Sequence, residues 1–199
     1  MLKAERKLKR SAVSCIFATL TSLLLPPTAA AQPQKLAAEQ LLPATLGPTQ
    51  LTERRQLQPE IQGIVFRYSN GPGFWATVFV FDAGLKNISL SLTDPIVLFA
   101  FAHAENEIKA MAADGRISAA RIPDEPARLV KPSPCGREYL RKDIELDVQG
   151  GTNASYIALT TVRGKFVKVR LTHLLPHAQF KADAERFFAD LARALGECS

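Results

Sequence analysis

The sequence predicts an α+β fold in which two helices pack on an antiparallel sheet of about six strands. Residues 156–162 and 166–173 are rich in β-branched residues, and a short turn at residues 163–165 joins them into a hairpin. After Pro176, apolar residues recur at helical spacing up to Gly196, which predicts an amphipathic helix lying over the hairpin. The complete order is β-β-α-β-β-β-β-α, and its mostly short connections favour antiparallel pairing.

Residues 1–31 are typical of a secretory signal peptide. Five basic residues precede a mostly apolar run at residues 11–25, which is shorter than a transmembrane helix. Two prolines end this run, and the small residues that follow suit signal peptidase. We expect cleavage after Ala31 and a periplasmic or secreted bacterial protein. An uncleaved N-terminal anchor is the alternative.

The positive charge of the chain comes mostly from this leader. The whole chain has 25 basic and 19 acidic residues. Without the leader's five basic residues and one acid, 20 basic and 18 acidic residues remain, a net charge of +2. Whole-chain charge therefore gives no argument for nucleic acid as a partner. After signal cleavage no segment is long and apolar enough to predict a transmembrane helix.

The chain after the leader divides into a lead-in and one domain. Residues 32–60 are rich in Ala, Gln, Leu and Pro, which predicts a poorly structured segment, and residues 61–199 form the α+β domain. The first strands are predicted at residues 63–68 and 74–82. The second is apolar on both faces, as a central or covered strand is. One of its faces carries Trp75, Phe79 and Phe81, for which we expect a core role, with an aromatic ligand-binding face as the alternative.

A helix and two further strands lie between these strands and the hairpin. Asp94 suits a helix N-cap and Pro95 the first helical position, and the apolar spacing continues to an Asp-Gly pair. A short strand is predicted at residues 116–122. Residues 123–136 hold four prolines, which predicts an ordered loop or an edge crossing. Residues 137–148 alternate between apolar and charged positions, as a half-exposed strand does.

Three motifs resemble those of a family of small exported bacterial proteins. They are Tyr156-x-x-Leu-Thr-x-x-Arg-Gly-Lys-Phe-Val-Lys-Val-Arg-Leu-Thr, the later Phe-Phe-x-x-Leu-x-x-x-Leu, and the earlier Ala-Thr-Val-Phe-Val-Phe-Asp-Ala-Gly. They are similar to PsbP-like proteins, a superfamily that includes Mog-type and DcrB-like proteins. The resemblance spans residues 63–195 and implies an antiparallel sheet flanked by helices in a non-enzymatic binding or assembly module. It carries over no catalytic residue, and residues 123–136 depart from the pattern.

Two cysteines remain after the predicted cleavage, Cys135 and Cys198. Two thiols in an exported protein usually form a disulfide, because the compartment is oxidising. The predicted bond ties the end of the last helix to the proline-rich loop. Two unrelated thiols are the alternative. A catalytic cysteine is disfavoured because the chain has no Cys-x-x-Cys motif.

The predicted hairpin carries a basic strip opposite its apolar residues. Since side chains alternate with a period of two, the cations are expected on an outer, solvent-facing side. The strip consists of Arg163, Lys165, Lys168 and Arg170. It is the candidate partner-binding surface, for an acidic partner, a lipid headgroup or a glycan acid. In the alternative it is neutralised by the acids of a neighbouring strand, which are Asp143, Glu145 and Asp147.

His173-x-x-x-His177 has a spacing found in metal sites. The pair lies at a strand-to-helix junction, and folding would have to bring a further ligand such as Asp183 or Glu185. The alternative function is therefore a small metal-dependent or hydrolytic periplasmic enzyme that uses His173 and His177. A surface or capping role for the two histidines competes with this hypothesis.

The rest of the sequence carries no catalytic signature. His103 and Glu107 fall on the same side of the predicted helix, where such a pair is ordinarily an exposed contact. There is no Gly-x-Ser-x-Gly, no His-Glu-x-x-His and no phosphate-binding glycine loop. The leading hypothesis is an exported, non-enzymatic binding or accessory domain without a cofactor, whose partner is an unidentified protein or envelope component.

Overall fold

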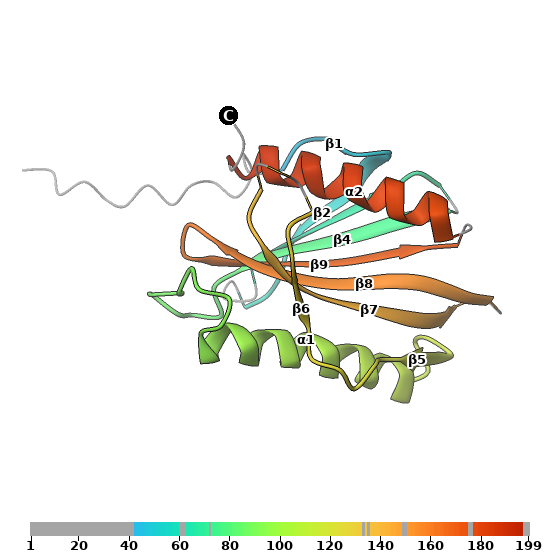
Figure 1. The fold of residues 1–199 in the computed structure, drawn as a ribbon, viewed down its shortest axis with the longest axis horizontal. Coiled ribbons are helices and arrows are strands. Elements are labelled where there is room, and N and C mark those ends of the chain that lie inside the picture. Colours follow the sequence, from blue (N-terminus) through green and yellow to red (C-terminus); the bar gives the residue numbers. More distant parts are fainter. Residues whose placement is uncertain are drawn as a thin grey trace, which may run out of the picture. The chain divides into compact units, whose positions relative to one another are not determined.

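The computed structural model describes residues 42–59, 63–71, 73–132, 134, 136–148, 151–174 and 177–196. In this part of the chain, nine strands form one antiparallel sheet on which two helices pack, which confirms the α+β class (Figure 1). The strands are β1 (Thr45–Leu46), β2 (Thr49–Gln56), β3 (Ile64–Ser69), β4 (Phe74–Phe81), β5 (Ala119–Arg121), β6 (Arg128–Val130), β7 (Tyr139–Val148), β8 (Gly151–Val162) and β9 (Lys165–His173). The helices are α1 (Pro95–Ala113) and α2 (His177–Ala194). The order across the sheet is β1-β2-β3-β4-β9-β8-β7-β5, and β6 also pairs with β7.

The β8–β9 hairpin forms as its residue types predict. Val162 pairs with Lys165, so Arg163 and Gly164 alone make the turn. Both residues have positive φ, 49° and 71° respectively. This is the geometry of a two-residue turn whose twist matches that of the flanking strands. The whole of β4 pairs with β9, so the most apolar strand lies inside the sheet, as expected.

Helix α2 covers one face of the sheet. The apolar residues of β9 on this face are Val167, Val169 and Leu171, which pack in one core cluster with the aromatic residues of α2. Those aromatic residues are Phe180, Phe187 and Phe188. Each large side chain taken out of water stabilises the fold by about 1.5–3 kcal/mol. Because the residues of β9 and α2 share one core cluster, the predicted packing of the last helix on the hairpin is confirmed.

Helix α1 lies on the opposite side of the sheet from α2 (Figure 1). It begins where the sequence predicts, because Oδ1 of Asp94 accepts a hydrogen bond from the backbone N–H of Ile96 at 2.9 Å. Its buried residues Val97, Phe101 and Ile108 pack against the face formed by β7 and β8. The sheet thus separates two cores, one under each helix.

The sheet has three strands more than the six predicted. Two of them, β1 and β2, lie within residues 32–60, so the prediction of a poorly structured lead-in is wrong for residues 45–46 and 49–56. Strand β2 is mostly exposed and polar, which leaves no apolar periodicity to detect. The third, β6, lies in the proline-rich segment and pairs with the start of β7. Three residues are too few to show a period.

The turn between β1 and β2 is attached to α2 through a glycine. The backbone N–H of Gly47 donates to Oδ2 of Asp190 at 2.7 Å. Its φ is 55°, and a Cβ at this position would lie 2.6 Å from the backbone N of Phe187. Any other residue would separate the turn from the helix or strain the backbone.

Several predictions fall on residues outside the described ranges. They concern the signal peptide at residues 1–31 and both cysteines of the expected disulfide, Cys135 and Cys198. These stay predictions. In the described part of the chain, no helix combines the length and the hydropathy needed to cross a membrane.

Candidate functional site

One face of β3, β4 and β9 carries aromatic and cationic side chains beside one another. Alternate residues of these strands pack under α2, so the remaining ones point to the other side of the sheet. The register places Lys168 opposite Phe79, and Arg170 opposite Thr77, whose neighbour on β3 is Arg67. We call this surface the cationic–aromatic face. It consists of Arg67, Trp75, Phe79, Lys168 and Arg170.

Helix α1 borders the cationic–aromatic face on one side. The helix packs chiefly on β8 and β5, and two of its residues, Glu107 and Met111, reach the cations of β9. Trp75 and Phe79 stay half-buried, and Arg67 is exposed. Aromatic and cationic groups of this face are therefore accessible from solvent next to the helix.

Lys168 is the most deeply buried cation of the face. Its side chain is 10% exposed, and Nζ donates to Oε2 of Glu107 at 2.5 Å. The same Nζ lies 4.4 Å from the ring centroid of Phe79. Burial lowers the pKa of Lys168, Glu107 opposes this shift, and the nearby charge of Arg170 adds to it. A second ring, that of Phe81, lies 5.7 Å from the same Nζ. One carboxylate and two aromatic rings thus replace most of the water around this ammonium.

Arg170 lies on the same strand and has a weaker partner. Its Nη1 donates to Sδ of Met111 at 2.9 Å, and a thioether is a poor acceptor. Burial lowers the pKa of Arg170; Glu107 opposes this effect, and the charges of Arg67 and Arg116 add to it. A guanidinium stays protonated all the same. Arg170 is therefore a part-buried cation that makes no ion pair in the described chain.

Positive charge exceeds negative charge at this face. Besides Lys168, Glu107 has a second partner, because its Oε1 lies 3.2 Å from Nδ1 of His103. This is the exposed helix contact that the sequence predicts for the two residues. Arg67 is 2.5 Å from a carboxylate oxygen of Glu53 on β2. Both carboxylates thus have direct partners of their own, and no carboxylate among the described residues forms an ion pair with Arg170.

The structure divides the predicted basic strip into two parts. Lys168 and Arg170 lie on the cationic–aromatic face beside α1, where Lys168 is buried and Arg170 half-buried, so the prediction of an outer, solvent-facing position is wrong for them. The reason is that α1 covers part of the face that alternation had assigned to solvent. Lys165, near the turn, forms an ion pair with Asp82. Arg163, in the turn itself, approaches Gly196 just after α2.

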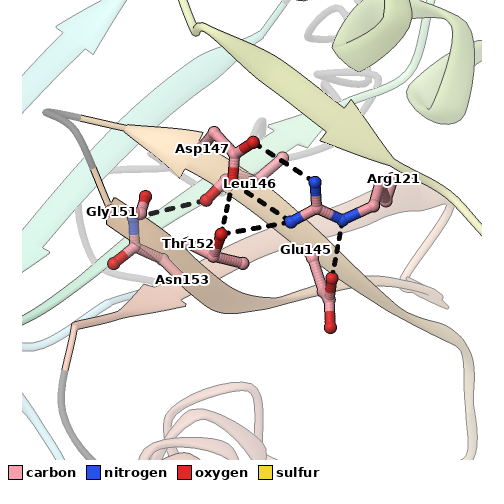
Figure 2. A network of polar contacts seen from close by, with 7 residues as sticks. All are labelled: Arg121, Glu145, Leu146, Asp147, Gly151, Thr152 and Asn153. Carbon is pink, nitrogen blue, oxygen red and sulfur yellow. Dashed lines mark hydrogen bonds and ion pairs between the residues drawn. The ribbon is translucent and has the colours of Figure 1, made fainter.

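The acids expected to neutralise the strip have other partners. Arg121 of β5 donates to Glu145 at 2.7 Å and, through two nitrogens, to Asp147 at 3.1 and 3.2 Å (Figure 2). Thr152 also donates to Asp147, and both contacts lower the pKa of that carboxyl group. The third acid, Asp143, pairs with Arg128 and Arg141. This network fastens β5 and β6 to β7, so none of the three acids pairs with Lys168 or Arg170.

His173, one of the two candidate metal ligands, is fully buried between the sheet and α2. Its Nε2 lies 3.3 Å from Oδ2 of Asp183, and the rings of Phe74 and Phe180 pack against it. Asp183 also accepts a hydrogen bond from Arg186. These contacts give His173 a place in the core. The side chain of His177 is outside the described residues, and no group of three potential ligands is found among the side chains that are described.

The contact of Glu107 with Lys168 was not predicted from the sequence. The helical spacing placed Glu107 beside His103, but it does not say which strand the helix lies on. One signal was present in the sequence: Glu107 and Met111 are four residues apart, so their side chains lie on the same side of the helix. Comparison with models of protein families and with curated proteins finds no match for this chain.

Proposed function

We propose that this chain is a non-enzymatic binding or accessory domain that recognises an acidic, partly apolar segment of a partner protein through the cationic–aromatic face. Arg170 carries the proposal. It is a part-buried guanidinium whose acceptor is a thioether, and it stands beside two further cations. A carboxylate from a partner would supply the missing charge and accept a bidentate hydrogen bond.

The aromatic residues of the face suit the apolar part of such a segment. Trp75 and Phe79 are half-buried, so each keeps contact area for a partner while its ring is already held in place by neighbouring strands. Tryptophan and arginine are the residue types that contribute most at protein interfaces. A rigid strand platform also limits the entropy lost on binding.

Two expectations from the sequence agree with this function. The resemblance to PsbP-like proteins implies a binding or assembly module, and the predicted leader implies export to the periplasm or beyond. Both are part of the proposal. They direct the search for the partner to an exported protein or an envelope component.

The experiment uses the single tryptophan of the chain as the reporter. A short synthetic peptide that alternates glutamate and leucine is titrated into the protein while Trp75 emission is recorded. The same peptide with lysine in place of glutamate is the second ligand. We expect a saturable change in emission with the acidic peptide and none with the basic one, because the face is positively charged.

Two charge reversals make the matched comparison. Arg67→Glu changes the face, and Arg193→Glu changes α2 on the other side of the sheet. Both arginines are exposed, by 52% and 65%, and each pairs with one carboxylate. Arg67→Glu is expected to weaken binding of the acidic peptide about tenfold or more, and Arg193→Glu to leave it unchanged. Equal affinity in both variants would remove the cationic–aromatic face from the function.

A further inference from the structure

A second surface of the molecule exposes large apolar side chains. Five such residues are exposed in the described chain, and one of them, Leu174, follows β9 at a distant point. The other four gather around the N-terminal half of α1, and we call them the apolar ridge. They are Leu90, Leu98, Phe99 and Leu129, with exposed fractions of 55%, 47%, 72% and 49%.

The first two turns of α1 are apolar on every side. Residues 95–102 contain no polar side chain. Val97 and Phe101 face the core, whereas Leu98 and Phe99 point to solvent. A helix that is apolar all round is ordinarily covered on all sides. Leaving an aromatic ring 72% exposed on such a helix indicates a surface that meets something other than water.

The leucines of the ridge lie on one side of α1. Leu90 and Leu129 line the same pocket, of about 280 Å³, together with Arg137 and Glu138. Leu129 is paired across strands with Leu140 of β7. Leu98 is seven residues from Glu105 and shares its side of the helix, and Glu105 lies 2.6 Å from Lys142 of the same strand. The cationic–aromatic face is on the other side of α1, towards β9.

Exposed lysines accompany the ridge. Lys86 is in the loop that carries Leu90, Lys109 is on the flank of α1 that carries Leu98, and Lys131 follows Leu129 by two residues. None of the three lysines forms an ion pair within the described residues. The nearest acids of the helix are occupied, Glu105 by Lys142 and Glu107 by Lys168.

We propose that the apolar ridge docks on an anionic membrane surface, with Leu98 and Phe99 inserted at the level of the acyl chains and the three lysines at the phosphate groups. An apolar patch rimmed by lysines complements a bilayer that contains anionic lipids. A second copy of this chain complements it less well. A two-fold contact would bring two copies of the same lysine-rimmed patch together, and their like charges would repel.

The test places a tryptophan on the ridge of the full chain. In a Trp75→Phe background, Phe99→Trp is the probe and Leu174→Trp is the control at the distant exposed leucine. Each variant is mixed with vesicles of phosphatidylcholine and phosphatidylglycerol, with or without brominated acyl chains. We expect a blue shift and quenching by bromine for Phe99→Trp and neither for Leu174→Trp. This site-specific readout is independent of any membrane affinity of residues 1–41.

Charge reversal gives the second arm. Lys109→Glu with Lys131→Glu is expected to lower the partition coefficient on anionic vesicles about tenfold or more. Lys181→Glu with Arg193→Glu, on α2, is expected to leave it unchanged. Absence of quenching at position 99, or equal quenching at 99 and 174, overturns the proposal. A blue shift that grows with protein concentration without lipid, together with a doubled mass in sedimentation, overturns it in favour of a dimer.

Discussion

Replacing Glu107 with glutamine tests whether charge holds α1 to β9. Glutamine keeps the shape of the side chain but removes the carboxylate that accepts from Nζ of Lys168 at 2.5 Å. Breaking a fully buried pair costs about 3–5 kcal/mol. The Glu107 side chain is 45% exposed, so solvent already screens part of the attraction. We therefore expect the free energy of unfolding to fall by about 2 kcal/mol at neutral pH, or about 4–8 °C in Tm.

The pH dependence of this loss identifies its origin. Burial already holds the pKa of Lys168 below its ordinary value, and loss of Glu107 removes the contact that opposes this shift. Between the folded-state pKa and the ordinary value of 10.5, the unfolded chain then binds more protons than the folded one. The stability of the variant accordingly rises as the pH increases through this window. As Lys168 loses its charge, the free energy of unfolding of Glu107→Gln therefore approaches that of the unmodified protein.

The assay is urea denaturation at neutral pH and at about pH 9.5. Asp124→Asn, in the exposed turn between β5 and β6, is the control and should change stability by less than about 0.5 kcal/mol. Adding Lys168→Met to Glu107→Gln should restore much of the lost stability, because it removes the unpaired charge. A Glu107→Gln loss that stays the same at both pH values would show that the contact acts by shape and would refute the electrostatic account.

Three further predictions concern other parts of the molecule. Gly47→Ala should lower the free energy of unfolding by about 2–4 kcal/mol. Gly164 also has positive φ but open space around it, so Gly164→Ala should lower the free energy of unfolding by only about 1 kcal/mol. Urea denaturation measures both. Asp147 has a lowered pKa, so its stabilising contribution is present above the ordinary value of 3.8 and is lost as the pH falls through the lower folded-state value. Asp147→Asn should therefore flatten the acid limb of a plot of stability against pH. Thiol titration of the denatured, unreduced mature protein should find no free thiol if Cys135 and Cys198 are bonded, and two free thiols would exclude the bond.

The sequence predicts those elements whose residues repeat with a clear period. Gly164, which takes positive φ without steric cost, predicted a turn at residues 163–165, and Asp94 offered an N-cap directly before a proline. Local chemistry of this kind is readable without tertiary information. Strand β2 could not be predicted in this way, because its side chains are mostly polar and exposed and show no apolar period, although its partner β3 is the next strand in the chain. Its strand character comes from the pairing with β3.

The candidate site was predictable in its residues but not in its arrangement. Alternation correctly separated Lys168 from Val167 and Val169, and it correctly grouped Trp75 with Phe79. It assigned the cations to solvent because the period of a strand says nothing about what lies above the sheet. Which residues of the sheet are covered depends on how α1 crosses the strands. Contacts between segments that are distant in sequence determine that crossing.

Two ion pairs fix this crossing, and with it both proposed surfaces. Glu105 and Glu107 are two residues apart, so they leave α1 on different flanks. Glu105 reaches Lys142 of β7, and Glu107 reaches Lys168 of β9. These strands are the two neighbours of β8, on which the helix packs. Apolar contacts alone would let a helix slide or rotate, since hydrophobic attraction has no direction. The paired carboxylates hold α1 across β8, so that the cationic–aromatic face stays open beyond Glu107 and the ridge around Phe99 stays turned to the outside.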